Sequence, residues 1–151
     1  MSEAKTPALS ALHIYRPKIR FSDIDAMGIV NNAMFLTYFE ESRVHFFSEL
    51  IGTQWDWHSA GVVVARHEIS YRRPILYKSE VEIITWADRL GGKSLDMAYE
   101  VWICEGGLRQ TLSAEARTTL VAYDHTTGKS CAVPSAWIEP MQELGLGRPG
   151  F

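Results

Sequence analysis

A chain of 151 residues is the size of one domain and can bury its own core, so we expect a single domain spanning 1–151, ordered over roughly 12–144. Its 46% hydrophobic and 22% charged residues exclude a largely disordered chain. The net charge of −3 argues against a broad surface for nucleic acid, so any anionic ligand must be bound locally.

The sequence lacks the marks of secreted, membrane and metal-binding proteins. No signal peptide is visible at the N-terminus, and no apolar run is long enough to cross a membrane. Cys104 and Cys131 are too few for a disulfide framework, and the five histidines show no metal-site spacing. We therefore expect a cytoplasmic protein without a membrane partner, a metal or a cofactor.

The first predicted element is a strand over residues 13–21, which follows a frayed tail over residues 1–11. Pro17 lies inside this strand and has no N–H to donate, which favours a position at the edge of a sheet or an irregularity. The strand leads directly into a polar loop.

The loop contains two acids and a glycine and opens into a long apolar segment. Asp23 and Asp25 precede Gly28, which permits dihedral angles that are closed to other residues. Asn31 or Asn32 is well suited to cap a helix, because its side-chain oxygen can accept a hydrogen bond from a free N–H one turn later. From residue 33 the aromatic residues recur at helical spacing, and a glycine at position 52 is a plausible end.

The rest of the chain alternates as strands. We predict strands over 62–71, 80–87, 95–104 and 109–123, a hairpin turn at 105–108, a short helix from Pro134 capped by Ser135, and a frayed end over 145–151. One strand, one long helix and four further strands indicate an α+β fold in which a five-stranded antiparallel sheet curls around one central helix. Such a sheet leaves an open edge, so we expect a homodimer at least.

Several motifs together resemble the hotdog-fold acyl-CoA thioesterases, specifically the 4-hydroxybenzoyl-CoA thioesterase-like group. The main motif is residues 21–43, FSDIDAMGIVNNAMFLTYFEESR. Similar residues of that family correspond to 71–74 (YRRP), 90–94 (LGGKS) and 123–129 (YDHTTGK), and the resemblance covers roughly 13–141. It implies a hotdog fold and hydrolysis of an acyl or aryl thioester to a free acid and a thiol.

The resemblance also assigns roles around the acidic loop. It places the catalytic carboxylate on Asp25, as nucleophile or as general base, and the donor to the carbonyl oxygen on the backbone N–H of Asn32. Gly28 lets the thioester approach closely, and Asn31 caps the helix or orients the substrate. Asp23 is expected to be structural, and Glu40 is the alternative acid.

Substrate-binding residues follow from the chemistry of a CoA thioester. Its phosphates require cations near the pocket mouth. The candidates are Arg72, Arg73, Arg89 and Lys93, with Ser94 as a hydroxyl donor. Phe35 and the other aromatic side chains suit aryl and medium aliphatic acyl groups alike.

Alternatives to hydrolysis stay open. Relatives carry histidine or tyrosine at the positions of Asn31 and Asn32, or histidine at Ile29, so this chain lacks an auxiliary imidazole in the loop. A dehydratase or hydratase of the same fold needs a histidine beside the carboxylate, and a non-catalytic acyl-thioester-binding protein needs neither. The thiol carrier can be CoA or acyl carrier protein, and the oligomer can be a dimer or a dimer of dimers, a homotetramer.

Overall fold

The computed structural model describes residues 13–150. Its elements in chain order are β1 (Ile14–Tyr15), η1 (Phe21–Asp23), α2 (Met34–Ile51), β2 (Gly61–Tyr71), β3 (Glu80–Leu90), β4 (Ser94–Glu105), β5 (Leu108–Asp124), β6 (Lys129–Ser130) and α3 (Ser135–Leu144). None of the helices in this part of the chain is long and apolar enough to cross a membrane.

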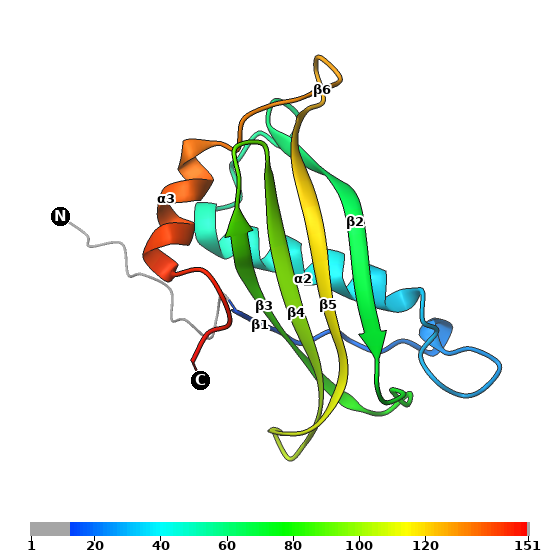
Figure 1. Ribbon diagram of the computed structural model, residues 1–151. Helices are drawn as coiled ribbons and strands as arrows, with labels where there is room; N and C mark the ends of the chain where they lie inside the picture. Colours follow the sequence, from blue (N-terminus) through cyan, green and yellow to red (C-terminus); the bar gives the residue numbers. More distant parts are fainter. Residues whose placement is uncertain (1–12, 151) are drawn as a thin grey trace.

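The strands form one antiparallel sheet in the order β1-β3-β4-β5-β2, and the short β6 pairs with β5. Figure 1 shows this sheet curling around α2, with α3 beside the C-terminal end of α2. The predicted α+β hotdog fold is confirmed, and its five predicted strands correspond to β1 to β5. The two-residue β6 is a sixth strand that the sequence pattern did not predict.

The central helix forms where the aromatic spacing predicted it. Its aromatic side chains are buried against the sheet: Phe35, Tyr38, Phe39, Phe46 and Phe47. Phe39 stacks on Tyr99 of β4, with ring centroids 4.5 Å apart. Gly52 ends the helix with φ +80°, a conformation that costs glycine little. The first turn of α2 therefore lies at a fixed place on the sheet.

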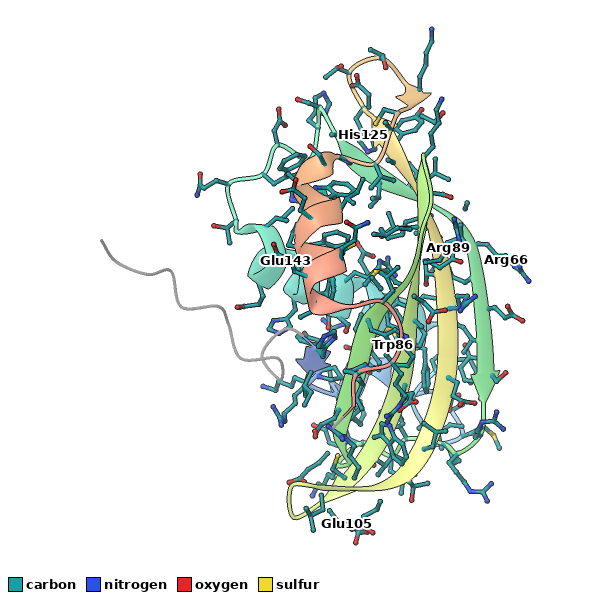
Figure 2. All side chains as sticks on the ribbon, turned by 60° about the vertical axis from the view of Figure 1, so that its left-hand side comes forward. Arg66, Trp86, Arg89, Glu105, His125 and Glu143 are labelled. Carbon is teal, nitrogen blue, oxygen red and sulfur yellow. The ribbon has the colours of Figure 1, made fainter. Side chains whose placement is uncertain are left out.

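A second apolar cluster lies on the outer face of the sheet, away from α2. Its members are Ile84, Trp86, Ala98 and Trp102. The segment after α3 lies against this face, where Gly147 donates to the Ala87 carbonyl (2.9 Å) and the Arg148 Nε donates to the Glu100 carboxylate (2.8 Å). Figure 2 shows Trp86 beside this segment. The prediction that the C-terminal end frays is therefore wrong for residues 145–148.

Two local predictions also need correction. The first strand is much shorter than 13–21, because the chain leaves the sheet after Tyr15 and Pro17 is followed by the 3₁₀ turn η1. It does pair at the edge of the sheet, as the proline predicted. Pro134 occupies the N-cap of α3, so Ser135 is the first helical residue and makes no capping hydrogen bond. The predicted tail over residues 1–11 lies outside the described residues.

Candidate functional site

The acidic loop between η1 and α2 is a small hairpin. Ile24 and Val30 form an isolated antiparallel bridge, and the Asp25 N–H donates to the Ile29 carbonyl (2.8 Å). Gly28 closes the turn with φ +80°, and its N–H donates to the Asp25 carbonyl (3.0 Å). The positive φ predicted for this glycine is present, and the hairpin holds Asp25 in a defined backbone conformation.

The Asp25 carboxylate is half-buried and uses one oxygen locally. Its Oδ1 accepts a hydrogen bond from the Met27 N–H (2.8 Å), which is an Asx turn. Its Oδ2 has no hydrogen-bond or ion-pair partner among residues 13–150. One carboxylate oxygen is therefore left to act on a substrate or a water molecule.

Two asparagines form the junction between the loop and α2. Asn31 Oδ1 accepts from the Ala33 N–H (2.9 Å), which is an Asx turn just before the helix. The N-cap residue of α2 is Ala33 and has no side-chain cap, so the predicted N-cap at Asn31 or Asn32 is one or two residues too early. The Asn32 carbonyl accepts from the Phe35 N–H (3.3 Å) and from the Tyr71 hydroxyl (2.9 Å). The end of β2 is thereby tied to the start of the helix.

The Asn32 N–H makes no hydrogen bond within the described part of the chain. Asn32 directly precedes Ala33, the N-cap residue of α2, and the positive end of a helix dipole attracts negative charge. A hollow of about 210 Å³ lies beside Asn32. The hollow is lined by Ile29, Val30, Asn32, Phe35, Tyr71, Arg72, Arg73 and Pro74.

The hollow brings together four of the residues singled out from the sequence. These are Asn32, Phe35, Arg72 and Arg73, whereas Asp25, Gly28 and Asn31 do not line it. Asp25 belongs to the same hairpin as Ile29, which does line it. The single chain thus places the predicted donor at a cavity and the predicted carboxylate on the adjoining loop.

Asp23 is a buried carboxylate beneath this loop, only 1% exposed. It accepts hydrogen bonds from the Arg20 N–H (3.0 Å), the Tyr38 hydroxyl (2.8 Å) and the Arg20 Nε (3.3 Å). Burial opposes its charge, but these bonds outweigh burial and hold the pKa of Asp23 below its usual value. The Asp23 carbonyl also accepts from the Asn31 N–H (2.9 Å). Asp23 is structural, as expected, but its partner Tyr38 was not foreseen.

The two arginines after β2 differ in how free their charges are. Arg72 donates through Nε to the Glu115 carboxylate (2.8 Å), so much of its charge is already compensated. The Arg73 side chain donates only to the Arg72 carbonyl (3.1 Å) and has no carboxylate partner in residues 13–150. Of the two, Arg73 is the better candidate for a phosphate.

Arg89, Lys93 and Ser94 do not lie near the Asp25 loop of the same chain. The Lys93 carbonyl accepts from the Ala122 N–H (2.9 Å), opposite the start of β2, whereas the Asp25 loop adjoins the end of β2. An eleven-residue strand spans about 35 Å. Figure 1 shows the β3–β4 turn and the loop before α2 at opposite ends of the sheet.

Arg89 is also engaged by a carboxylate. Its Nε donates to Asp96 Oδ2 (2.9 Å) and its Nη2 donates to Ser94 Oγ (2.9 Å). The Arg89 guanidinium holds the pKa of the Asp96 carboxyl below its usual value. The exposed ammonium group of Lys93 has no partner in the described residues, so Lys93 is the freer cation at this turn.

No group of three or more His, Cys, Asp or Glu side chains within residues 13–150 is placed to hold a metal ion. His67 lies on β2 with its Nδ1 2.9 Å from Thr118 Oγ1. No histidine is part of the loop that carries Asp25.

Comparisons with known proteins lead to thioesterases. Residues 19–142 match the family described as the thioesterase-like superfamily. The long-chain acyl-CoA thioesterase FadM of Escherichia coli K12 is 28% identical over 128 residues, which are 84% of this chain and 95% of FadM.

Solved structures show the same likeness. A thioesterase from Thermus thermophilus, complexed with coenzyme A and Zn, has a TM-score of 0.75 and 34% identity over 93% of this chain and 98% of its own. The 1,4-dihydroxy-2-naphthoyl-CoA thioesterase Slr0204 of Synechocystis has a TM-score of 0.76 at 17% identity, over 87% of this chain and 96% of its own. At that identity the likeness shows the fold alone.

Proposed function

The chain belongs to the thioesterase-like superfamily, and from this premise we propose that it is an acyl-CoA thioesterase that uses the loop before α2. Its products are a free carboxylic acid and the CoA thiol. The observation that carries the proposal is the unpartnered Asn32 N–H at the start of α2, beside a hollow and next to the hairpin of Asp25.

In the proposed reaction, the thioester carbonyl oxygen accepts a hydrogen bond from the Asn32 N–H. This hydrogen bond becomes stronger as negative charge develops on the oxygen, and the helix dipole stabilises the same charge. The free oxygen of Asp25 either attacks the carbonyl carbon or takes a proton from an attacking water molecule. Gly28 keeps the turn free of a side chain, so that the thioester can approach the backbone.

The proposed enzyme works as a homodimer at least. The β2 edge of the sheet has no strand partner in the described chain, and Val64 on it is 45% exposed. A second copy beside β2 offers a way to bring Lys93, Arg89 and Ser94 of one subunit toward the Asp25 loop of the other. There, Lys93 and Arg73 are the cations proposed for the phosphates of CoA.

The test is the variant Asp25→Asn. Its side-chain oxygen can still accept from the Met27 N–H, so the Asx turn and the fold should survive. We expect kcat for acyl-CoA hydrolysis to fall roughly 100- to 10,000-fold, because the variant lacks the nucleophile or base. Thiol release is measured over a panel of acyl-CoAs of graded length with one aryl member.

Asp124→Asn is the matched control, because Asp124 Oδ1 accepts from the Thr126 N–H (2.8 Å) in the same kind of turn at the far end of β5. It should keep full activity. Full turnover in Asp25→Asn would overturn the role of Asp25. CoA-ester binding without thiol release in the wild type would favour the non-catalytic binding protein instead.

A further inference from the structure

A second cavity lies between α2 and the free edge strand β2, with a volume of about 420 Å³. Most of its lining is apolar: Val44, Phe47, Trp57, Val62, Val64 and Leu120. Three polar side chains of α2 complete it, Glu40, Arg43 and Ser48. The cavity shares no lining residue with the hollow beside Asn32.

The cavity lies on the same stripe of the helix as the proposed oxyanion donor. Positions 32, 36, 40, 43–44 and 47–48 recur at helical spacing, so they follow one face of α2. The Tyr71 hydroxyl bonds the Asn32 carbonyl at one end of β2, and Val62 and Val64 line the cavity at the other. At 1.5 Å per residue, Arg43 lies about 16 Å along the axis from Asn32. One face of α2 therefore leads from Asn32 to the cavity.

Arg43 is the unusual feature of this cavity. It is only 8% exposed, and its Nη1 donates to the Tyr99 hydroxyl (3.1 Å). No carboxylate lies within ion-pair distance of it, and its Nε and Nη2 have no partner among residues 13–150. Burying a cation without a counter-ion is costly, and buried charges are normally paired. The open side of this guanidinium therefore suits an anion from outside the chain.

The groups that face Arg43 do not supply that anion. Tyr99 comes from β4, and His67 from β2 bonds Thr118 from β5. Burial, and then the charge of Arg43, lower the pKa of His67, which favours its neutral imidazole. Glu40 lines the same cavity, but it is exposed and water screens its charge.

We propose that the cavity takes the far part of the acyl group and that Arg43 binds a carboxylate at its end, so that the enzyme prefers CoA thioesters of long dicarboxylic acids to those of plain fatty acids. The inference rests on the proposed function, because the acyl group is placed by its carbonyl at Asn32. The apolar walls accept the methylene chain, and the planar fork of the guanidinium matches a carboxylate.

The experiment compares dodecanoyl-CoA with the mono-CoA thioester of dodecanedioic acid, which differ only at the far end. The wild type should have the higher kcat/KM for the dicarboxylic thioester. Arg43→Leu should lower the ratio of the two kcat/KM values about 10- to 100-fold, because a hydrogen-bonded ion pair is lost. Arg43→Lys, which keeps the charge but not the fork, should restore part of the ratio.

Arg66→Leu is the matched control. Arg66 lies on β2, the strand that lines the cavity, but it pairs with Glu68 on an exposed face, and Figure 2 shows it pointing away from the sheet. It should leave the ratio unchanged. An unchanged ratio in Arg43→Leu, or a wild-type preference for dodecanoyl-CoA, would overturn the proposal. A lower solution mass of Arg43→Leu would also overturn it, because Arg43 would then serve a subunit contact.

Binding of the free acids separates this proposal from the proposed function. Titration calorimetry with dodecanedioic and dodecanoic acids needs no hydrolysis. If the wild type hydrolyses neither thioester but binds the diacid more tightly, and Arg43→Leu loses that preference, the Arg43 site stands while the thioesterase function fails. Equal binding of the two acids by the wild type would count against the site itself.

Discussion

The contact between Tyr38 and Asp23 joins the first turns of α2 to the loop that carries Asp25. The Tyr38 hydroxyl donates to a carboxylate that is 1% exposed, and burial followed by this hydrogen bond raises the pKa of Tyr38. The tyrosine is therefore a permanent donor over the whole physiological range. Because Asp23 also holds the Asn31 N–H through its carbonyl, this contact helps to fix the helix start in place.

We predict that Tyr38→Phe lowers the free energy of unfolding at pH 7 by about 2 kcal/mol, because a buried charged acceptor loses one donor. The folded-state pKa of Asp23 is depressed, so this stabilisation is present above the unfolded value near 3.9 and is lost as pH falls through the folded value. The difference between wild type and variant should therefore shrink below about pH 4. Urea unfolding at several pH values measures it.

Tyr15→Phe is the control for that measurement, since the Tyr15 hydroxyl donates to Glu41 (3.0 Å) at a less buried site. It should cost less than Tyr38→Phe. Equal losses in both variants, or a Tyr38→Phe difference that does not change with pH, would contradict the account of Asp23.

Single residues were predictable where their role is local. Asn31 forms an Asx turn just before the helix and Gly28 has a positive φ, and both follow from residue type and near neighbours. The pairing of Asp23 with Tyr38 joins residues fifteen apart, and Arg43 with Tyr99 joins residues fifty-six apart. Only the folded chain shows these, because they depend on how α2 lies on the sheet.

At the scale of elements, the hairpin before α2 depends on the conformation of Gly28. A Cβ there would meet no atom within 4 Å, so only backbone strain opposes a side chain at φ +80°. We predict that Gly28→Ala costs about 1 kcal/mol of unfolding free energy. We also expect lower kcat, because the hairpin that carries Asp25 must shift. Thermal unfolding and thiol release measure the two effects.

Gly92→Ala is the control for the hairpin, because a Cβ at Gly92 also meets open space and its φ is not positive. It should be nearly neutral in stability and activity. A neutral Gly28→Ala would mean that the hairpin tolerates another conformation without harm.

Helices and strands were predicted well where the spacing of apolar residues or a turn residue marks them, as for α2 and β2. The length of the N-terminal strand was overestimated. Polar and apolar residues still alternate after Tyr15, but the pairing with β3 ends there. The C-terminal segment was expected to fray, although it has a hydrogen-bond partner on the sheet. Its contact with Ala87 depends on the outer face of a sheet whose curl the sequence does not show.

At the scale of the whole molecule, the curled sheet has a long strand at one edge. β2 is eleven residues long, and its only strand partner in the described chain is β5. Long unprotected edges tend to pair with another chain. Val64 near the start of this strand, and Val44 opposite it on α2, are 45% and 61% exposed. Together they make the side of the molecule next to β2 more apolar than a solvated edge would be.

We predict that a second copy pairs with the β2 edge and forms the outer wall of the Arg43 cavity, and that Val64→Lys weakens the dimer, because the added ammonium group would be buried without a partner. Light scattering after size exclusion should show the wild type at twice the chain mass or a larger even multiple, and Val64→Lys at a smaller multiple. Leu108→Lys is the control, because Leu108 is 67% exposed at the β4–β5 turn, away from β2. If Val64→Lys keeps the wild-type mass while remaining folded, the β2 edge is not the contact. The cations of the β3–β4 turn would then have no route to the Asp25 loop through that edge.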